Sequence, residues 1–556
     1  MSSIFNLAIA GINAMKIMID NTTDKINHPN QENIARRIFI ENTVQNSNLD
    51  HSVKVKEIYD RYNDFITEER RKTQAQVQDD QTQIEQLLKL EDLLCEKSSI
   101  FNKVLKMLYQ TIYKHIGFKN IILRQDQFEN YLKESEIEQE AKKLVLEINN
   151  FDKKLNFLEE DIKKNIMNNI IRANELIDKI HDATIDIRYF PVKELPNRID
   201  SFIDKRDHLV DELNDLIGIK VVKGNDSYKI YLNNGICIID NNHKQNLIPL
   251  ISKSDEKYIS IGYIDENENK VKKIENMVSN SILGALFKFK REDLTNTRNK
   301  ISQLTVKFSH IIDSHFLLGY DIFSHFGKKL FNISQPEVIP SSTNRSSPMT
   351  SVKWIDKGSA KDTDYIIYFK NNNWIITKLS DRTIVSPFIH HLDNGSVFIT
   401  FDGIEFAVTA ENTDGNIYMI KPYSNTLKEF QVLVDSTYVN LLHNNNIDNI
   451  QKNPDFFMKN ITTYFTEESS SDDTETLDQS YQKFSKSITH KCKSLEEKIP
   501  FKKNMIRILH DKKASMFNNM EQNYENLNFQ QEAYLANVRV LQVAEKIFNE
   551  IIECYS

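Results

Sequence analysis

The chain has few of the residues that build small rigid sites. It contains four cysteines among 556 residues, at no spacing typical of a metal or redox centre: Cys95, Cys237, Cys492 and Cys554. So few cysteines in so long a chain exclude a disulfide framework. There are 13 glycines, about a third of the number expected at the usual ~7%. This scarcity argues against glycine-rich phosphate-binding loops and favours long helices.

Strong positive charge and membrane-length apolar runs are also missing. The net charge is −8, so binding to nucleic acid has no global electrostatic support. No apolar run reaches the ~20 residues that span a bilayer, and we expect no membrane insertion. The first segment has no basic side chain at its start, and Asn6, Asn13 and Lys16 interrupt its apolar residues. We therefore expect a structural helix that stays in the mature chain.

The signatures of common catalytic and cofactor sites are absent as well. No GxSxG, Walker-type or GxGxxG pattern occurs. The adjacent His390 and His391 stand beside turn residues without a nearby carboxylate, which predicts a surface loop rather than a metal site. His310 and His315 are five residues apart on a predicted helix and do not share a face. We expect no catalytic, cofactor-binding or metal residue.

What the chain does have is a long apolar helix at its C-terminus, residues 520–555. Every seventh residue of this segment is apolar or aromatic: Met520, Leu527, Tyr534, Leu541, Phe548 and Tyr555. The companion positions are apolar at Tyr524, Val538 and Ile552 and polar at Gln531 and Glu545. This pattern predicts a coiled-coil seam with two polar interruptions. A second apolar stripe consists of Ala533, Val540, Ala544, Ile547 and Ile551, so the helix needs several neighbours.

The N-terminus carries a matching helix. One heptad-like stripe consists of Ile4, Ala8, Gly11, Met15 and Met18, and the neighbouring stripe of Phe5, Ile9, Ile12 and Ile19. Periodicity alone also fits an ordinary C-terminal helix packed on its own core. Two apolar helices at the two chain ends, where chains usually fray, favour pairing of the termini. The predicted interface consists of Ile4, Ala8, Gly11, Met15, Met18, Leu527, Tyr534, Val538, Leu541, Phe548 and Ile552.

Between the ends, helical and strand patterns alternate. Helical spacing appears at residues 55–66 and is sustained from Leu144 to Ile177, which predicts one long amphipathic helix. Short strands are expected at 219–222, 228–232 and 236–239, and a helix at 279–313. Further strands are expected at 365–369, 374–378, 397–401, 404–408 and 417–420, with Asp402-Gly403 as a hairpin turn.

These patterns predict an α+β multidomain fold with paired terminal coiled-coil helices, a long helical bundle and small inserted β-rich domains. The expected divisions are 1–52 for the N-terminal coiled-coil segment, to which the resemblance described below implies roles in export and polymerisation, 53–190 for bundle helices, 191–331 for a helix with a small β subdomain and a bundle helix, 332–352 for a linker, 353–460 for a β-rich outer domain, 461–476 for an acidic joint, 477–519 for further bundle helices and 520–556 for the C-terminal coiled-coil helix. The linker and the joint rest on Ser/Pro-rich and acidic composition.

Several segments resemble the flagellar hook-associated protein 1 family, a branch of the flagellar axial (rod, hook and junction) proteins. The N-terminal match uses Ala8, Gly11, Ala14, Asn21, Ile26 and Asn27, and the Gly-Tyr usually found downstream is missing, leaving Arg36 or Arg37 for the family's arginine. The C-terminal match uses Glu525, Asn526, Leu527, Gln530, Gln531, Tyr534, Ala536, Asn537, Val540, Leu541 and Ala544. Internal matches use Arg206, Asp207, Leu209, Val210, Glu212, Leu213, Leu216 and Gly218, then Gly284, Leu286, Asp293, Leu294 and Arg298, and the strand segments 361–381 and 401–422.

The resemblance implies a structural protein at the hook–filament junction of a bacterial flagellum, secreted unfolded through the flagellar type III channel with an uncleaved N-terminal signal. Expected partners are further copies of the chain in a ring or tube, the hook protein, the third hook-associated protein with the filament, and an export chaperone. The terminal segments 1–40 and 520–556 are expected to order on assembly. Two alternatives remain. One is another axial protein, such as a flagellin-like or third hook-associated protein, and the other is an intracellular coiled-coil scaffold.

Overall fold

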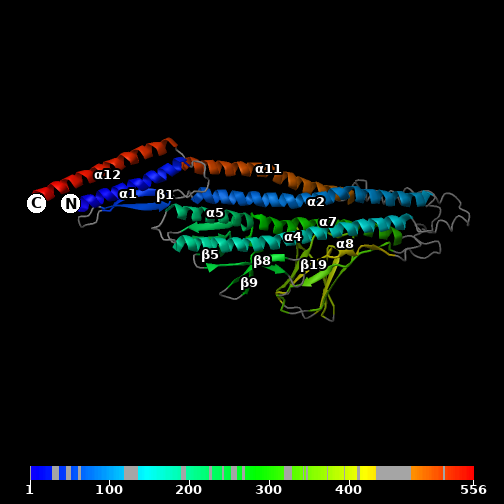
Figure 1. The fold of residues 1–556 in the computed structure, drawn as a ribbon. Helices are drawn as coiled ribbons and strands as arrows, with labels where there is room; N and C mark the ends of the chain where they lie inside the picture. Colours follow the sequence, from blue (N-terminus) through cyan, green and yellow to red (C-terminus); the bar gives the residue numbers. More distant parts are fainter. Residues whose placement is uncertain are drawn as a thin grey trace, which may run out of the picture.

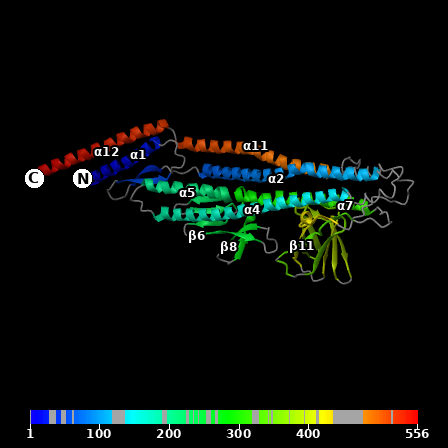
Figure 2. The ribbon, with the colours of Figure 1, turned by 45° about the vertical axis from the view of Figure 1, so that its right-hand side comes forward.

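The computed structural model describes residues 2–27, 37–44, 52–59, 64–117, 136–189, 196–223, 228–233, 235–240, 243–251, 259–265, 270–317, 329–341, 343–345, 348–371, 373–392, 395–409, 414–433, 477–517 and 520–555. The molecule is elongated (Figure 1). The two terminal helices lie at one end, long helices run along the body, and most of the β-structure lies on one side of them, which a second view confirms (Figure 2). This is the α+β arrangement predicted.

The body is a bundle to which both halves of the chain contribute. Its elements are α2 (Asp64–Gly117), α4 (Glu136–Tyr189), α5 (Pro196–Ile217), α6 (Ile282–Lys288), a π-helical turn (Phe289–Leu294), α7 (Thr295–Leu317) and α11 (Leu477–Phe517). The helix α11 runs antiparallel to α2: Tyr481 donates to the carbonyl oxygen of Leu94 (2.6 Å), and Lys502 contacts Asp80 (2.5 Å). The C-terminal half of the chain therefore completes the core begun by the N-terminal half.

The long helix predicted around residues 144–177 is confirmed as α4. Its apolar stripe is buried over its whole length, from Leu144 through Leu155 and Ile166 to Ile180. Lys153 and Lys154 are exposed, as expected for a solvated face. Because the period of 3.6 residues is sustained, α4 packs against α2, α5 and the sheets along one continuous side.

Two small antiparallel sheets follow α5. The first contains β3 (Ile219–Lys223), β4 (Tyr228–Leu232), β5 (Cys237–Asp240) and β6 (His243–Lys244), and the second contains β7 (Leu247–Ile251), β8 (Ile259–Asp265) and β9 (Lys270–Lys273). The three strands predicted here are confirmed. Gly218, with a φ angle of 65°, caps the end of α5, where its amide donates to the Asn214 carbonyl oxygen (2.9 Å).

The outer β-structure is a sandwich of two antiparallel sheets. One has the order β11-β19-β13-β14-β15 and the other β12-β18-β17-β16. The strands are β11 (Glu337–Pro340), β12 (Thr350–Trp354), β13 (Tyr365–Lys370), β14 (Asn373–Lys378), β15 (Ile384–Val385), β16 (Phe388–His391), β17 (Val397–Phe401), β18 (Ile404–Val408) and β19 (Ile417–Lys421). Aromatic residues from both sheets, including Tyr365, Phe406 and Tyr418, form a separate core.

The prediction of a linker at 332–352 is wrong. Its residues include β11, which pairs with β19, and the start of β12, which pairs with β18. Both are edge strands, where a proline such as Pro340 removes no ladder hydrogen bond from a neighbour. The Ser/Pro-rich composition is therefore that of two sheet edges, and the sandwich begins before residue 353. The rest of the predicted outer domain, 434–460, and the acidic joint, 461–476, lie outside the described residues.

Two further local predictions are wrong. Residues 55–59 belong to strand β2 (Ser52–Tyr59), which pairs with β1 (Arg37–Val44), although their apolar residues also fit a helical period. The division at residue 52 thus cuts through a hairpin. His390 and His391 lie on the exposed edge strand β16 rather than in a loop. Short apolar runs fit the period of a helix and that of a strand equally well. In residues 55–59, pairing with a second strand determines the structure.

The sandwich joins the bundle through a narrow neck. Strand β10 (Phe331–Asn332) enters beside β20 (Gln431–Val432), which follows the short helix α8 (Thr426–Glu429). Rings of Phe331 and Phe430 stack at 5.0 Å, and the Asp313 carboxylate on α7 accepts from the amides of Leu330 (2.9 Å) and Phe331 (3.1 Å). Further along α7, Gln303 donates to the Ala360 carbonyl oxygen (2.8 Å). The two units are thus attached by polar contacts around a small aromatic cluster.

One of these contacts makes stability depend on pH. Asp364 is buried and accepts a hydrogen bond from Asn299 on α7 (3.3 Å), and burial raises its pKa from 3.8 to about 6. Because the folded state takes up the proton first, stability should rise as pH falls from about 6 to about 4. Asp364→Asn should therefore be more stable than the wild type at pH 7 by about 3 kcal/mol, with the gap closing by pH 4. Thermal unfolding at several pH values measures this gap.

The control for this variant is Asp362→Asn, two residues away. It removes an ion pair with Lys300 (3.2 Å) in which the Asp362 side chain is 45% exposed and the Lys300 side chain 16%, and because one partner remains in solvent it should change stability by about 1 kcal/mol or less. An Asp364→Asn protein that is less stable than the wild type at pH 7 would contradict the prediction.

Candidate functional site

The terminal helices form the candidate site. The helices α1 (Ser2–Asn27) and α12 (Met520–Tyr555) lie side by side at one end of the molecule (Figures 1 and 2). They run antiparallel, because Thr22 near the end of α1 donates to Gln530 Oε1 (2.9 Å), while Gly11 lies against Asn537. The chain ends predicted to pair therefore do pack against each other.

Small residues bring the two helices close together. Ala8, Gly11, Ala14 and Met15 are buried on α1. A Cβ atom placed on Gly11 would lie 2.7 Å from Asn537 Oδ1, closer than such atoms pack. A larger residue at position 11 would thus displace the Asn537 side chain or push the helices apart.

The predicted interface residues divide into three groups. Ala8, Gly11 and Met15 are buried, whereas Met18, Leu527, Tyr534, Val538 and Leu541 are half-buried. The side chains of Ile4, Phe548 and Ile552 lie outside the described residues. Periodicity missed the polar contacts of Thr22, Gln530 and Asn537, because an apolar pattern carries no signal for them. Gln530 and Asn537 do appear in the motif that resembles the family.

The pair leaves much apolar surface open to solvent. On α1, Ile9 is 46% exposed, and on α12 the second predicted stripe contributes Val540 (47%) and Ile547 (46%), while Ala544 of that stripe is buried. The predicted seam of α12 is half-buried, and the second apolar stripe beside it is largely exposed. The single partner helix α1 therefore covers only part of the apolar surface of α12. Helices apolar on more than one face require further neighbours.

The pair is also separate from the folded body. Neither hydrophobic core contains a described residue of α1 or α12. Among the described elements, α1 packs against α12 and the hairpin β1–β2. The terminal pair therefore adds little to the stability of the bundle.

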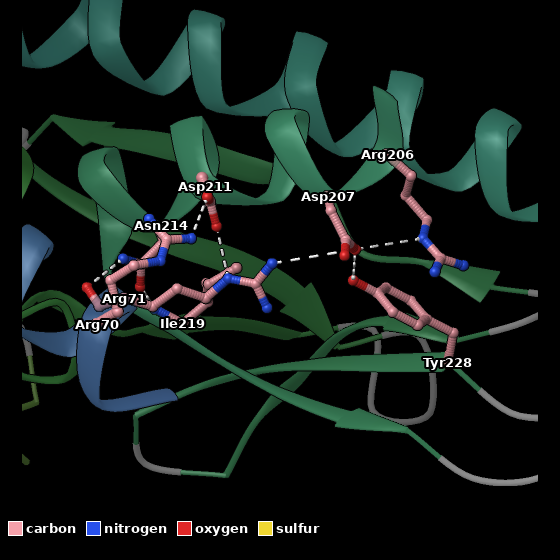
Figure 3. Close-up of polar contacts among 8 residues, drawn as sticks. All are labelled: Arg70, Arg71, Arg206, Asp207, Asp211, Asn214, Ile219 and Tyr228. Carbon is pink, nitrogen blue, oxygen red and sulfur yellow. Dashed lines mark hydrogen bonds and ion pairs between the residues drawn. The ribbon is translucent and has the colours of Figure 1, made fainter. Parts of the chain in front are cut away.

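A partly buried ion network, with Arg71 as its most buried member, holds the bundle next to this end (Figure 3). Asp211 on α5 accepts from Arg70 (2.6 Å) and Arg71 (2.6 Å) on α2. Burial alone would raise the pKa of Asp211, but the charges of Arg71 and Arg70 outweigh it and lower the pKa. Asn214 adds a donor to the Arg71 carbonyl oxygen (2.7 Å) and accepts from the Ile219 amide (3.2 Å). We call Arg70, Arg71, Asp211 and Asn214 the α2–α5 clamp.

The network continues from the clamp to strand β4. Tyr228 donates to Asp207 (3.5 Å), and the Arg206 guanidinium lies 3.7 Å from the centre of the Tyr228 ring. Burial raises the pKa of Tyr228, so its hydroxyl remains a donor at neutral pH. Arg206 and Asp207 belong to the motif in α5 that resembles the family. The motif thus has a structural role in joining α2, α5 and the first small sheet.

The described residues also bear on two other kinds of site, metal centres and membrane spans. Among these residues, no group of three or more His, Cys, Asp or Glu side chains is arranged to hold a metal ion. Within that same part of the chain, no helix combines the length and apolar character needed to cross a membrane.

Comparison with known proteins gives one consistent result. Residues 130–331 match the flagellar hook-associated protein FlgK helical domain, and residues 340–422 match the D2-like domain of flagellar hook-associated protein 1. Flagellar hook-associated protein 1 of Buchnera aphidicola subsp. Schizaphis graminum is 50% identical, with 100% of both chains covered. The Salmonella typhimurium and Escherichia coli proteins of that name are each 24% identical, with 99% of this chain and 100% of theirs covered.

A solved structure supports the fold. The flagellar hook junction protein FlgK from Burkholderia pseudomallei aligns with a TM-score of 0.68 at 12% identity and covers 81% of this chain and 100% of that chain. At this identity the likeness shows the architecture alone. Full-length identity of 50%, two domain matches and the shared architecture agree: this chain belongs to the flagellar hook-associated protein 1 family.

Proposed function

We propose that the protein is a structural subunit of the hook–filament junction and that it assembles through its paired terminal helices. The observation that carries this proposal is the α1–α12 pair, which is apolar on its open side and absent from both cores. A helix pair that contributes nothing to its own core, yet exposes Val540, Val543 and Ile547, has the surface expected of an interface between subunits.

The proposed arrangement follows from the shape of the chain. The helices α1 and α12 form the polymerising end, the helices α2, α4, α5, α6, α7 and α11 form the body, and the sandwich lies to one side. Copies of the chain form a ring or tube. Its two faces meet the hook protein and the third hook-associated protein with the filament, and an export chaperone binds the chain before secretion. The names of the relatives support a place in the flagellum for this assembly.

Hydrogen exchange tests the assembly role. Two paired helices without other partners are only marginally stable, because helices depend on tertiary packing. In the dilute monomer, the backbone amide hydrogens of residues 1–40 and 520–556 should therefore exchange quickly, and protease should cut these two segments. The amide hydrogens of α4 should be protected from exchange. On assembly at the hook tip, both terminal segments should gain protection. The core helix α4 serves as the internal control.

The opposite result would refute the proposal. Strong protection of both ends in a dilute monomer, equal to that of α4, would make the terminal pair a part of the folded body. A protein that is secreted but never found at the hook tip by electron microscopy would contradict the junction role itself.

A further inference from the structure

A second exposed apolar stripe lies on the bundle helix α11. Phe501 is 74% exposed, Met505 40% and Ile508 46%. Lys498 and Lys512, both exposed, extend the series at each end. The five residues recur at spacings of three, four, three and four, which places them on one side of the helix. We call these residues the α11 stripe.

The α11 stripe faces away from the bundle. The other side of the helix packs on α2, where Lys502 contacts Asp80 and Thr489 donates to Glu91 (2.5 Å). Leu495 and Cys492 on that side belong to the bundle core. The stripe therefore does not serve the bundle of its own chain, and its spacing is that of a helix-binding seam.

A complementary surface exists on α12. Phe529 (69% exposed), Val540 (47%), Val543 (57%) and Ile547 (46%) lie on one side of that helix, with exposed Ala536 between them. Glu525 and Glu532, both exposed, occupy the N-terminal part of the same side. We call this series the α12 stripe.

Charge favours a match between the two stripes. The α11 stripe carries Lys498 and Lys512 and no acidic residue, whereas the α12 stripe carries Glu525 and Glu532 and no basic residue. A basic apolar helix face and an acidic apolar one attract each other, and two faces of the same sign do not. The α12 stripe is thus a better partner for the α11 stripe than a second α11 stripe.

The α12 helix of the same chain is held elsewhere. It packs against α1 and extends beyond the end of α11 instead of folding back along it (Figure 1). We propose that the α11 stripe receives the α12 stripe of a second copy. Such a contact joins two different surfaces, so it repeats from copy to copy and builds a ring or a tube. This inference rests on the proposed assembly function and names the surface that receives the terminal helix.

Photo-cross-linking between distinguishable copies tests the contact. Subunits with benzoylphenylalanine at position 505 are assembled with isotopically heavy wild-type subunits, and cross-linked peptides are identified by mass spectrometry. We expect light-to-heavy links from position 505 to residues 525–547. A probe at Phe157, which is 78% exposed on α4, is the control and should give no links to α12.

The cross-linking results distinguish failure of the proposed α11–α12 contact from failure of the proposed assembly function. Assembly with links from position 505 to any other segment, or only within one chain, would overturn the contact and leave the assembly role intact. Failure of wild-type subunits to assemble would overturn both.

Charge reversal provides an independent measurement. Lys498→Glu with Lys512→Glu should raise the critical concentration for assembly at least tenfold without changing monomer unfolding, because both side chains are exposed. Glu525→Lys with Glu532→Lys on α12 should restore much of the loss. An unchanged critical concentration, or a loss that the α12 reversal does not restore at all, would refute the match.

Discussion

Leu541→Asp should abolish assembly while leaving the thermal unfolding of the monomer unchanged. Leu541 lies in the middle of α12 at the apolar heptad position, and its side chain is half-buried in the α1–α12 pair. Covering this surface with further helices would bury an unpaired carboxylate at a cost of several kcal/mol in every subunit. A cost of about 3 kcal/mol raises the critical concentration more than a hundredfold. Differential scanning calorimetry of the monomer and microscopy of hook tips measure the two effects.

The control for this change is Glu545→Asp, four residues along the same helix. Glu545 is exposed, and a shorter carboxylate there should leave assembly normal. In cells with Leu541→Asp, filament subunits should leak into the medium because the junction is missing. If Leu541→Asp lowered the melting temperature of the monomer by several degrees, α12 would belong to the core of its own chain.

The second large effect is expected in the α2–α5 clamp. Asp211→Ala leaves two arginines without their closest carboxylate, and the Arg71 side chain is only 7% exposed. Removing one partner of a buried ion pair costs about 3 kcal/mol or more, because the remaining charge stays desolvated. For a domain of ~200 residues this corresponds to a fall in melting temperature of roughly 6 to 12 °C. Calorimetry of the bundle transition measures it.

The neighbouring residue provides a matched control. Glu212 forms an ion pair with Arg172 (2.8 Å) in which both side chains are at least a third exposed. Glu212→Ala should therefore cost less than about 1 kcal/mol. Equal losses for the two variants would show that the clamp is no stronger than a surface ion pair.

Periodicity predicted those parts of the fold that depend on neighbours in the sequence. The helix α4 and the strands β13, β14, β17 and β18 repeat their own pattern often enough to be recognised alone. The Asp402-Gly403 turn is confirmed, and both residues have positive φ angles, 43° and 79°. Such a turn is encoded by residue type at two adjacent positions.

The remaining parts depend on distant partners. Arg70 and Arg71 stand in a run of charged residues that resembles a solvated helix face. Arg71 is buried and Arg70 half-buried because both pair with Asp211, which lies about 140 residues further along the chain. The edge strands β11 and β12 likewise acquire their structure from β19 and β18. A pattern confined to one segment carries no signal for a partner elsewhere.

The sequence predicted which faces of the terminal helices pair, but not which residues touch each other. Heptad spacing indicated that Ala8, Gly11 and Met15 face a partner, and they are buried. It could not indicate that Asn537 lies directly against Gly11, because close approach depends on the axial alignment of two helices more than 500 residues apart.

The neck between bundle and sandwich affects how freely the length and sequence of the sandwich can vary. Strands β10 and β20 pair where the chain leaves and re-enters the bundle, so the two crossing points lie side by side. A segment with adjacent ends can be lengthened, shortened or exchanged at a small entropic cost, because loop closure changes slowly with length. The sandwich is in this sense a module whose sequence can change with little effect on the bundle. If the terminal helices carry assembly as proposed, the outer surface can vary without altering the contacts between subunits.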